Sequence, residues 1–308
     1  MGRYALGRLL QLVIVFFGVT LLIYVAVFAL PGDPIRNLAG HQQLPPTTID
    51  NIRAQYHLND PFWKQYLRYI GGVVHGDFGS DFYGNSVWQL MRDRWPVTLR
   101  LASMAWLFEI VIGIGLGVAA ALQRRKLTDH AVLLLAVTVI GVPAFVAAYA
   151  AQLVFGVKAG IFPIAGVAQG WPTSYVLPAL VLGAFGFASV SRLMRSSMLE
   201  SLQADYVRTA IAKGLPWHRI VLRHALRNSL ISVLTYLALD LGYLLAGTVV
   251  IEGVFNLPGV GQLLFTSIQQ QQGPVVVGVA TSLILIFLLL NLAVDFLYGV
   301  LDPRIRLG

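Results

Sequence analysis

The stretch LLQLVIVFFGVTLLIYVAVFAL, residues 9–30, decides the fold class of this chain. It contains no charged side chain and exceeds the roughly 20 apolar residues that an α-helix needs to cross the hydrocarbon core of a bilayer. Other long apolar stretches follow it, and we expect them to span the membrane too: residues 97–122, 131–155, 175–191, 229–251 and 275–298. The sequence therefore predicts an all-α integral membrane protein with six transmembrane helices.

The composition supports this class. Hydrophobic residues make up 57% of the 308 residues and charged residues 12%, which is outside the range of ordinary soluble domains. The apolar runs are continuous and show no alternation of period two, so helices are favoured over a transmembrane β-barrel. The fourth span is the shortest, and its start depends on whether Pro178 lies in a first helical turn, where its missing N–H costs little.

Positively charged residues predict the orientation of the spans, because short cytoplasmic loops are enriched in lysine and arginine. An N-terminus inside the cell places most basic side chains of the short connections in the cytoplasm. They are Arg3, Arg8, Arg124, Arg125, Lys126, Arg192, Arg195, Arg208, Lys213, Arg219, Arg223, Arg227, Arg304 and Arg306. The outer short loops contain only Lys158, so both termini are expected to be cytoplasmic. The net charge of +8 is then a signal of topology rather than of nucleic-acid binding.

We divide the chain into an N-terminal end with the first span (1–30), an external loop (31–96) and a five-span core (97–308). The external loop has too many aromatic side chains for a disordered linker, so we expect a small folded cap. Within this cap, Asp60 is expected to cap a short helix whose first residue is Pro61. The cap either packs on the spans alone or contacts a partner protein, and the sequence leaves both open.

Small residues and one proline predict how the spans pack. Glycines allow helices to approach closely, and an internal proline removes a backbone hydrogen bond and kinks a helix. We expect close approach at Gly113, Gly115 and Gly117 of the second span and at Gly183 and Gly186 of the fourth, and a kink at Pro143 of the third.

The inner connection, residues 192–228, holds the most informative pattern: DYVRTAIAKGLPWHRIVLRHALRN, beginning at Asp205. We expect a helix with Asp205 in its first turn, where a negative charge is favourable. Gly214 then follows the helix, at a position where positive φ is cheap only for glycine, and Pro216 turns the chain. A second helix is expected to begin near Trp217. Together the two helices form a compact basic knob, suited to docking into a groove of another protein.

This pattern resembles the cytoplasmic EAA loop of ABC-importer permeases, most closely in the dipeptide, oligopeptide and nickel branch. Four further motifs in order resemble the first of the two permease subunits of that branch, the DppB/OppB type: LPGDP (30–34), GDFGS (76–80), VVIEGVFNLPGVG (249–261) and DPRI (302–305). One feature departs from the family's pattern. The general motif begins Glu-Ala-Ala six residues before its glycine, whereas this chain has Arg208, Thr209 and Ala210 before Gly214.

The resemblance implies the type I ABC-importer architecture in a bacterial plasma membrane, surrounded by lipid. It implies a complex with a homologous second permease of the DppC/OppC type, two cytoplasmic ATP-binding subunits (DppD/DppF, or fused) and an external substrate-binding protein of the DppA/OppA type. The loop would couple this chain to the ATPases through Asp205, Arg208, Thr209, Ala210, Lys213, Gly214, Leu215, Pro216, Trp217 and Arg219. Short peptides are the expected cargo, with nickel chelates, haem or glutathione as alternatives.

Buried acidic residues and the segment after the fifth span provide candidates for the translocation pathway. A carboxylate at membrane depth is costly and usually faces a bundle interior or a water-filled cavity. Glu109 and Asp240 fall near the middle of spans, where each either lines the pathway or is paired structurally. Asp295 is expected to pair with a neighbouring helix end. Tyr243 is a further candidate for the pathway or gate, and Glu252, Phe255 and Asn256 belong to a segment that resembles the family's external gate.

Absent motifs narrow the function further. The chain has no G-x-x-x-x-G-K-[ST] phosphate loop, so ATP and Mg²⁺ are expected on partner subunits and no cofactor on this chain. It lacks H-E-x-x-H and G-x-S-x-G, and neither a metal site nor catalysis is expected. Two rivals remain. A secondary transporter would be favoured by an internal inverted repeat, and the sequence shows none. An intramembrane enzyme would need a polar catalytic set within the spans.

Overall fold

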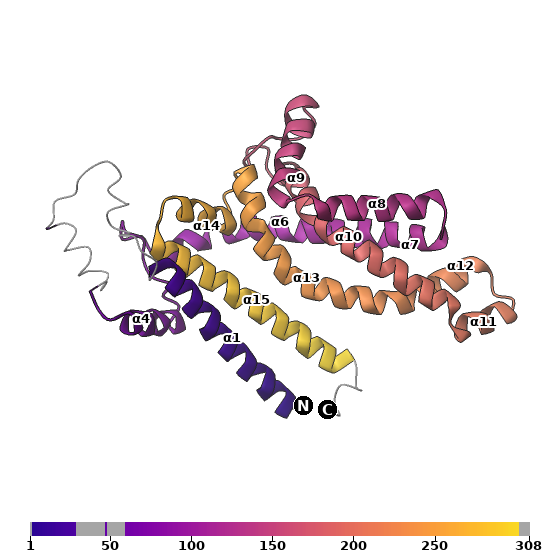
Figure 1. Cartoon of the computed structure of the whole chain (residues 1–308), viewed down its shortest axis with the longest axis horizontal. Helices are drawn as coiled ribbons and strands as arrows, with labels where there is room; N and C mark the ends of the chain where they lie inside the picture. Colours follow the sequence, from indigo (N-terminus) through magenta and orange to yellow (C-terminus); the bar gives the residue numbers. More distant parts are fainter. Residues whose placement is uncertain (1, 29–46, 48–58, 302–308) are drawn as a thin grey trace. The chain divides into compact units, whose positions relative to one another are not determined.

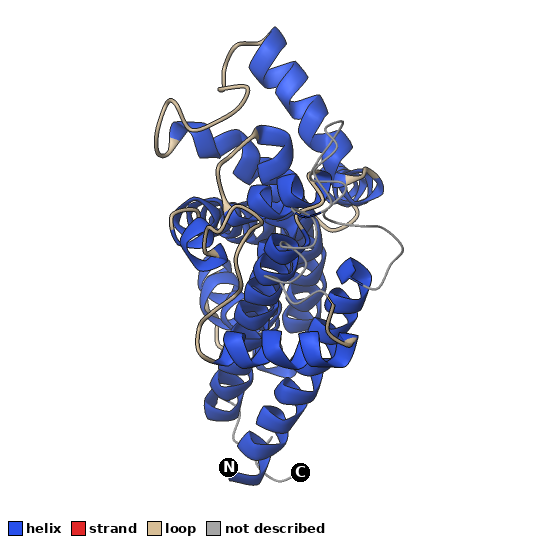
Figure 2. Cartoon of the chain, turned by 90° about the vertical axis from the view of Figure 1, so that its left-hand side faces the viewer, coloured by secondary structure: helices blue, strands red, loops and turns tan. Residues whose placement is uncertain are grey.

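A computed structural model describes residues 2–28, 47 and 59–301 of the chain. Within these residues the structure consists of helices and loops (Figure 1, Figure 2). The helices are α1 (Gly2–Phe28), α4 (Phe62–Val74), α5 (Val87–Arg92), α6 (Trp95–Phe108), η1 (Glu109–Gly113), α7 (Ile114–Leu122), α8 (Leu127–Gly141), α9 (Ala144–Ala151), η2 (Gln152–Lys158), α10 (Thr173–Gln203), α11 (Asp205–Ala212), α12 (Trp217–Arg219), η3 (Ile220–Ala225), α13 (Leu226–Phe255), α14 (Val260–Gln269) and α15 (Gly273–Leu301).

The helices confirm the predicted fold class. Among the described residues, five continuous helices are long and apolar enough to cross a bilayer, and a bent pair brings the number to six if it forms one span. The continuous helices are Gly7–Phe28, Val87–Leu122, Thr173–Gln203, Trp217–Phe255 and Gly273–Asp295. The π-helical turns η1 and η3 lie within two of these helices, and the π-helical turn η2 ends the second helix of the bent pair.

The third predicted span is broken. α8 and α9 meet at an angle of 106°, with Val142 and Pro143 between them. Pro143 has φ −57° and ψ 140°, so the backbone leaves the helical region there, as expected for a residue that lacks an N–H and clashes with the preceding turn. The predicted kink at Pro143 is confirmed, and it is large enough to separate two helices.

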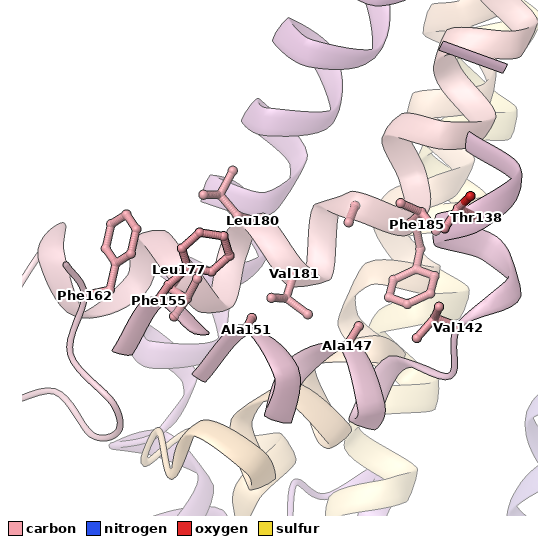
Figure 3. Close-up of a pocket in the computed structure, with 12 residues that line it drawn as sticks. Thr138, Val142, Ala147, Ala151, Phe155, Phe162, Leu177, Leu180, Val181 and Phe185 are labelled. Carbon is pink, nitrogen blue, oxygen red and sulfur yellow. The ribbon is translucent and has the colours of Figure 1, made fainter. Parts of the chain in front are cut away.

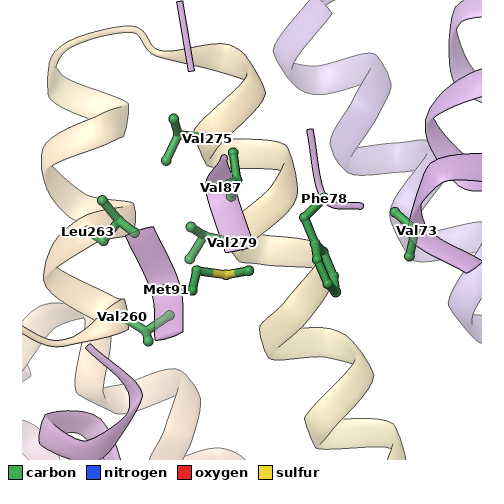
Figure 4. Close-up of a cluster of buried hydrophobic side chains, with 8 residues drawn as sticks. All are labelled: Val73, Phe78, Val87, Met91, Val260, Leu263, Val275 and Val279. Atoms are coloured by element: carbon green, nitrogen blue, oxygen red, sulfur yellow. The ribbon is translucent and has the colours of Figure 1, made fainter. Parts of the chain in front are cut away.

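The described chain forms two compact units, and the first comprises Met1–Thr98 and Pro258–Gly308. Here α1 and α15 lie side by side (Figure 1) and are joined by an ion pair between Arg8 and Asp295, at 3.3 Å. The predicted pairing of Asp295 with a neighbouring helix end is therefore confirmed. The core of this unit contains Val87 and Met91 of α5, which point toward α15 in Figure 4.

α4 belongs to this unit and corrects a detail of the prediction. Pro61 is the N-cap and Phe62 the first helical residue, one position later than expected, because Pro61 adopts φ −54° and ψ 139°. Asp60 instead forms an ion pair with Arg68, at 2.9 Å. Farther along the helix, the Tyr69 hydroxyl donates to Thr281 of α15, and desolvation raises the pKa of Tyr69. The hydroxyl therefore stays protonated as a donor.

The second unit comprises Leu99–Leu257 and is centred on α10. α10 packs against α7, α8 and α13. With α7 and α13 it shares an apolar core that includes Val190, Met194 and Leu237. Close approach is obligatory at Gly117, where an added Cβ would lie 2.6 Å from the Met194 side chain, and at Gly183, where it would lie 2.7 Å from the carbonyl oxygen of Ala105.

The glycine predictions hold with one exception. Added Cβ atoms at Gly113 and Gly186 would also collide with the facing helix. Gly115 has no atom within 4 Å of such a Cβ, so the expectation of close approach there is wrong. Spacing explains the difference, because positions 113 and 117 are four apart and share one helix face, whereas 115 points elsewhere.

The fourth span is longer than predicted. α10 runs without interruption over 31 residues, from Thr173 to Gln203, so the first part of the predicted inner connection is helical and continuous with the span. Pro178 lies inside the helix, beyond its first turn. Charged residues such as Arg195 ended the hydropathy signal at Ser191 but did not end the helix, because arginine is a good helix former.

Candidate functional site

The corner between α11 and α12, residues 205–219, has the structure that its sequence predicts. α11 begins at Asp205 and α12 begins at Trp217. Gly214 has φ +71°, the left-handed conformation expected after a helix. Its N–H donates to the carbonyl of Ile211 (2.9 Å) and the N–H of Leu215 to that of Ala210 (3.2 Å). This pair of bonds is a Schellman motif, which satisfies carbonyls that would otherwise lack partners.

A small apolar core supports the corner from beneath. Val207 and Ala210 of α11 pack against Ile220 of η3, and Leu215 covers them. Ala210 is therefore part of the core of the corner rather than of its surface, and within the predicted coupling loop it supports the fold. Because these buried residues hold the two helices against each other, the corner has a defined conformation.

The outer surface of the corner combines basic and apolar side chains. Ile211 and Trp217 are more than half exposed, at 53% and 57%. Apart from buried Ala210 and half-buried Leu215, the predicted coupling residues are exposed: Asp205, Arg208, Thr209, Lys213, Gly214, Pro216, Trp217 and Arg219. Arg208 lies 3.4 Å from Asp205, an exposed pair on one helix face. An exposed Trp and Ile among positive charges is the composition typical of a protein-binding surface.

An ion pair that the sequence analysis missed holds α10 to the turn between α7 and α8. Arg195 donates to both carboxylate oxygens of Asp129, at 2.5 and 2.7 Å, and the backbone N–H of Arg125 donates to the same carboxylate at 2.9 Å. Asp129 is almost fully buried. Its acidic side chain in the first turn of α8, among basic residues, was a visible signal of a capping or pairing role.

Three of the gate candidates, Glu252, Phe255 and Asn256, lie in a hydrogen-bonded turn at the end of α13. Asn256 ends the helix in the left-handed conformation, at φ 50°, and the N–H of Leu257 donates to the carbonyl of Glu252. The Phe255 carbonyl accepts from the N–H of Gly166, at 2.8 Å. The Glu252 and Phe255 side chains are buried, whereas Asn256 is exposed. These contacts tie the end of α13 to the connection that precedes α10.

Gln152 reinforces that connection, which the sequence analysis did not anticipate. Its amide nitrogen donates to the carbonyls of Ile164 (2.8 Å) and Val254 (3.1 Å). A buried amide on η2 thus joins both segments with a single side chain. The π-helical turn that carries it is the kind of irregularity often found at functional sites.

Two of the intramembrane carboxyls come together. Glu109 of η1 and Asp240 of α13 line one cavity of about 210 Å³, and Tyr243 lines it too. Glu109 is fully buried and Asp240 is 8% exposed. Tyr236 donates to Asp240 at 3.2 Å. Space for the Glu109 carboxyl depends on Gly186 of α10, since an added Cβ there would overlap it. The cavity does not contain Glu252, Phe255 or Asn256, so the candidate pathway residues fall into two separate groups.

A larger cavity lies where the bent pair faces α10. It has a volume of about 440 Å³ and is lined almost entirely by apolar side chains, with Phe155 and Phe162 at one end and Phe185 beside Val142 at the other (Figure 3). The break at Pro143 creates it, because α9 no longer continues the line of α8 along α10. Its chemistry matches a hydrocarbon environment rather than a polar solute.

Comparison with known proteins decides the family. Residues 113–307 match the family described as "Binding-protein-dependent transport system inner membrane component", and residues 1–102 match its N-terminal region. The chain belongs to this family of membrane transport components. The permease is 36% identical to the dipeptide transport system permease protein DppB of Escherichia coli strain K12 over 336 residues, with 99% of both chains covered.

The permease is also similar to a second kind of relative. It is 38% identical over 307 residues to the glutathione transport system permease protein GsiC, both from Salmonella paratyphi A and from Escherichia coli strain K12, with 99% of each chain covered. These matches confirm the resemblance to the DppB/OppB branch and the type I permease fold. The permease is thus a multi-pass membrane protein homologous to subunits of ABC importers.

Proposed function

We propose that this permease forms one half of the translocation pathway of an ATP-driven importer of short peptides. The observation that carries the proposal is the corner at residues 205–219, a rigid cytoplasmic-type protrusion with exposed Ile211 and Trp217. Its Schellman turn fixes its shape in advance, so docking on a partner loses little conformational entropy. A self-contained transporter would have no use for such a surface.

In this proposal the chain lies in a bacterial plasma membrane with both termini in the cytoplasm. It pairs with a homologous second permease, and the corner docks into a groove on one of two ATPase subunits. An external substrate-binding protein delivers cargo to the side opposite the corner. The chain itself catalyses no reaction; ATP and Mg²⁺ bind to the ATPases. Closure of the ATPase dimer moves the corner, and the spans follow.

The test is co-purification of the tagged permease from its native host in mild detergent. Ile211→Asp places a charge on the exposed surface of the corner without touching its core, so the corner should stay folded. We expect the variant to retain the second permease and to lose the ATPase subunits. Leu127→Asp is the matched control, because Leu127 is 86% exposed at the start of α8 and lies outside the corner.

Two results would overturn the proposal. One is equal recovery of ATPase subunits with the parent and with Ile211→Asp, since the corner would then not be the docking surface. The other is a permease that purifies alone and moves solute in proteoliposomes without ATP, which would identify a secondary transporter.

The substrate is tested with the assembled complex. The relatives are named for dipeptides and for glutathione, so both are candidates for this chain. We expect ATP-dependent uptake of a labelled dipeptide into proteoliposomes that contain the binding protein, and unlabelled glutathione should compete poorly. Stronger competition by glutathione than by unlabelled dipeptide would instead assign the permease to glutathione import.

A further inference from the structure

The cavity shared by Glu109 and Asp240 has an unbalanced chemistry. Both oxygens of Glu109 are buried and, among the described residues, neither accepts a hydrogen bond. Asp240, itself an acid, lines the same cavity. No basic side chain of the described chain lines the cavity. A buried carboxyl that no donor faces is a costly arrangement, because buried polar atoms in folded proteins are normally hydrogen-bonded.

One wall residue of the cavity is exposed, and the surrounding residues hold the carboxyls in place. Tyr243, which lines it, has an exposed fraction of 68%. Gly186 leaves room for the Glu109 carboxyl, and the Tyr236 hydroxyl orients Asp240. The carboxyls come from two different helices, so their meeting is a product of the tertiary fold rather than of sequence proximity.

We propose that Glu109 and Asp240 form a subsite for the positively charged amino group of the substrate during its passage. The inference deepens the proposed function and rests on it. A primary ammonium carries three donors, which matches two carboxyls with unused acceptor capacity. Dipeptides and glutathione share this group, so the subsite recognises the feature common to both candidate substrates and does not contact their side chains. The volume of about 210 Å³ has room for an amino group and the carbon that bears it.

A direct binding test uses the purified complex without the external binding protein. The probe is glycinamide, a primary ammonium without a carboxylate, and its neutral counterpart is N-acetylglycinamide. A bound ligand stabilises the folded state, so we expect glycinamide at saturating concentration to raise the melting temperature by about 3 °C. Glu109→Gln and Asp240→Asn should each abolish the rise. Glu200→Gln, an exposed site on α10, should retain it.

A transport test uses uptake into proteoliposomes. The ratio of initial uptake rates for a dipeptide with a free amino terminus and for its N-acetylated form should fall about tenfold in Glu109→Gln. Because the same binding protein delivers both peptides to the parent and to the variant, a change in this ratio arises in the membrane subunit.

Each other outcome overturns the inference. An equal rise in melting temperature with sodium or potassium chloride at the same ionic strength would identify an inorganic cation site. No rise with any cation would mean that the two carboxyls hold only a shared proton. Both results leave ATP-driven uptake by the parent intact. If the parent shows no ATP-driven uptake, the proposed function is contradicted, but glycinamide binding can still be measured.

Discussion

The ion pair between Asp129 and Arg195 allows a sharp test of what holds the second unit together. Asp129→Asn keeps the size of the side chain but removes its charge and turns one acceptor into a donor. The carboxylate accepts two hydrogen bonds from Arg195 and one from the backbone N–H of Arg125. Hydrogen bonds to charged groups contribute about 1.5–3 kcal/mol each, and breaking a buried pair costs about 3–5 kcal/mol.

The expected loss lies below that range. The Arg195 side chain is 22% exposed, so water can rehydrate the guanidinium once its partner is gone. We therefore expect a loss of about 2 kcal/mol in the free energy of unfolding, which corresponds to a melting temperature about 5 °C lower for a chain of this size. The measurement is thermal unfolding of the permease purified alone in detergent, so that the corner contacts no partner, followed by fluorescence-detected size exclusion.

Asp205→Asn is the matched control. Asp205 also pairs with an arginine, Arg208, at 3.4 Å, but its side chain is 95% exposed and the pair lies on one surface turn. Exposed pairs of this kind contribute little to stability, so no measurable shift is expected. Equal melting temperatures for Asp129→Asn and Asp205→Asn would refute the reasoning, because burial and three hydrogen-bond donors would then add nothing to the stability of the ion pair.

Three further predictions concern helix packing and buried hydrogen bonds. Gly117→Ala should destabilise the chain by about 1–3 kcal/mol through collision with α10, whereas Gly115→Ala, which meets nothing, should be neutral or slightly stabilising; thermal unfolding compares them. Tyr69→Phe removes the donor to Thr281 and should cost about 1 kcal/mol, measured in the same assay. Gln152→Leu should leave two carbonyls without their donor and increase hydrogen exchange in the segment around residue 164, with no change near the corner.

Local chemistry explains which features could be predicted from the sequence. The spans follow from composition, because lipid requires continuous apolar helices. The corner follows from Gly214 and Pro216, since only a glycine adopts φ +71° cheaply and a proline cannot continue a helix. The break at Pro143 has the same origin. Each of these features depends on residues within a few positions of one another.

Features that depend on distant residues could not be predicted in the same way. Asp129 and Arg195 are separated by 66 residues, and no local pattern pairs them. The meeting of Glu109 with Asp240 likewise depends on how two helices pack around Gly186. The length of α10 was misjudged for another reason. Hydropathy measures where a helix leaves the lipid, whereas the helix itself continues as long as its backbone hydrogen bonds do.

The continuity of α10 has a mechanical consequence. A helix of 31 residues is about 46 Å long at a rise of 1.5 Å per residue, longer than the hydrocarbon core by roughly half. Such a rod acts as a lever. A tilt of about 5° around one end would displace the other by about 4 Å, about three-quarters of the rise of one helical turn. Only Ala204 separates α10 from the corner, so a small tilt of α10 within the membrane would displace the corner outside it by several ångströms.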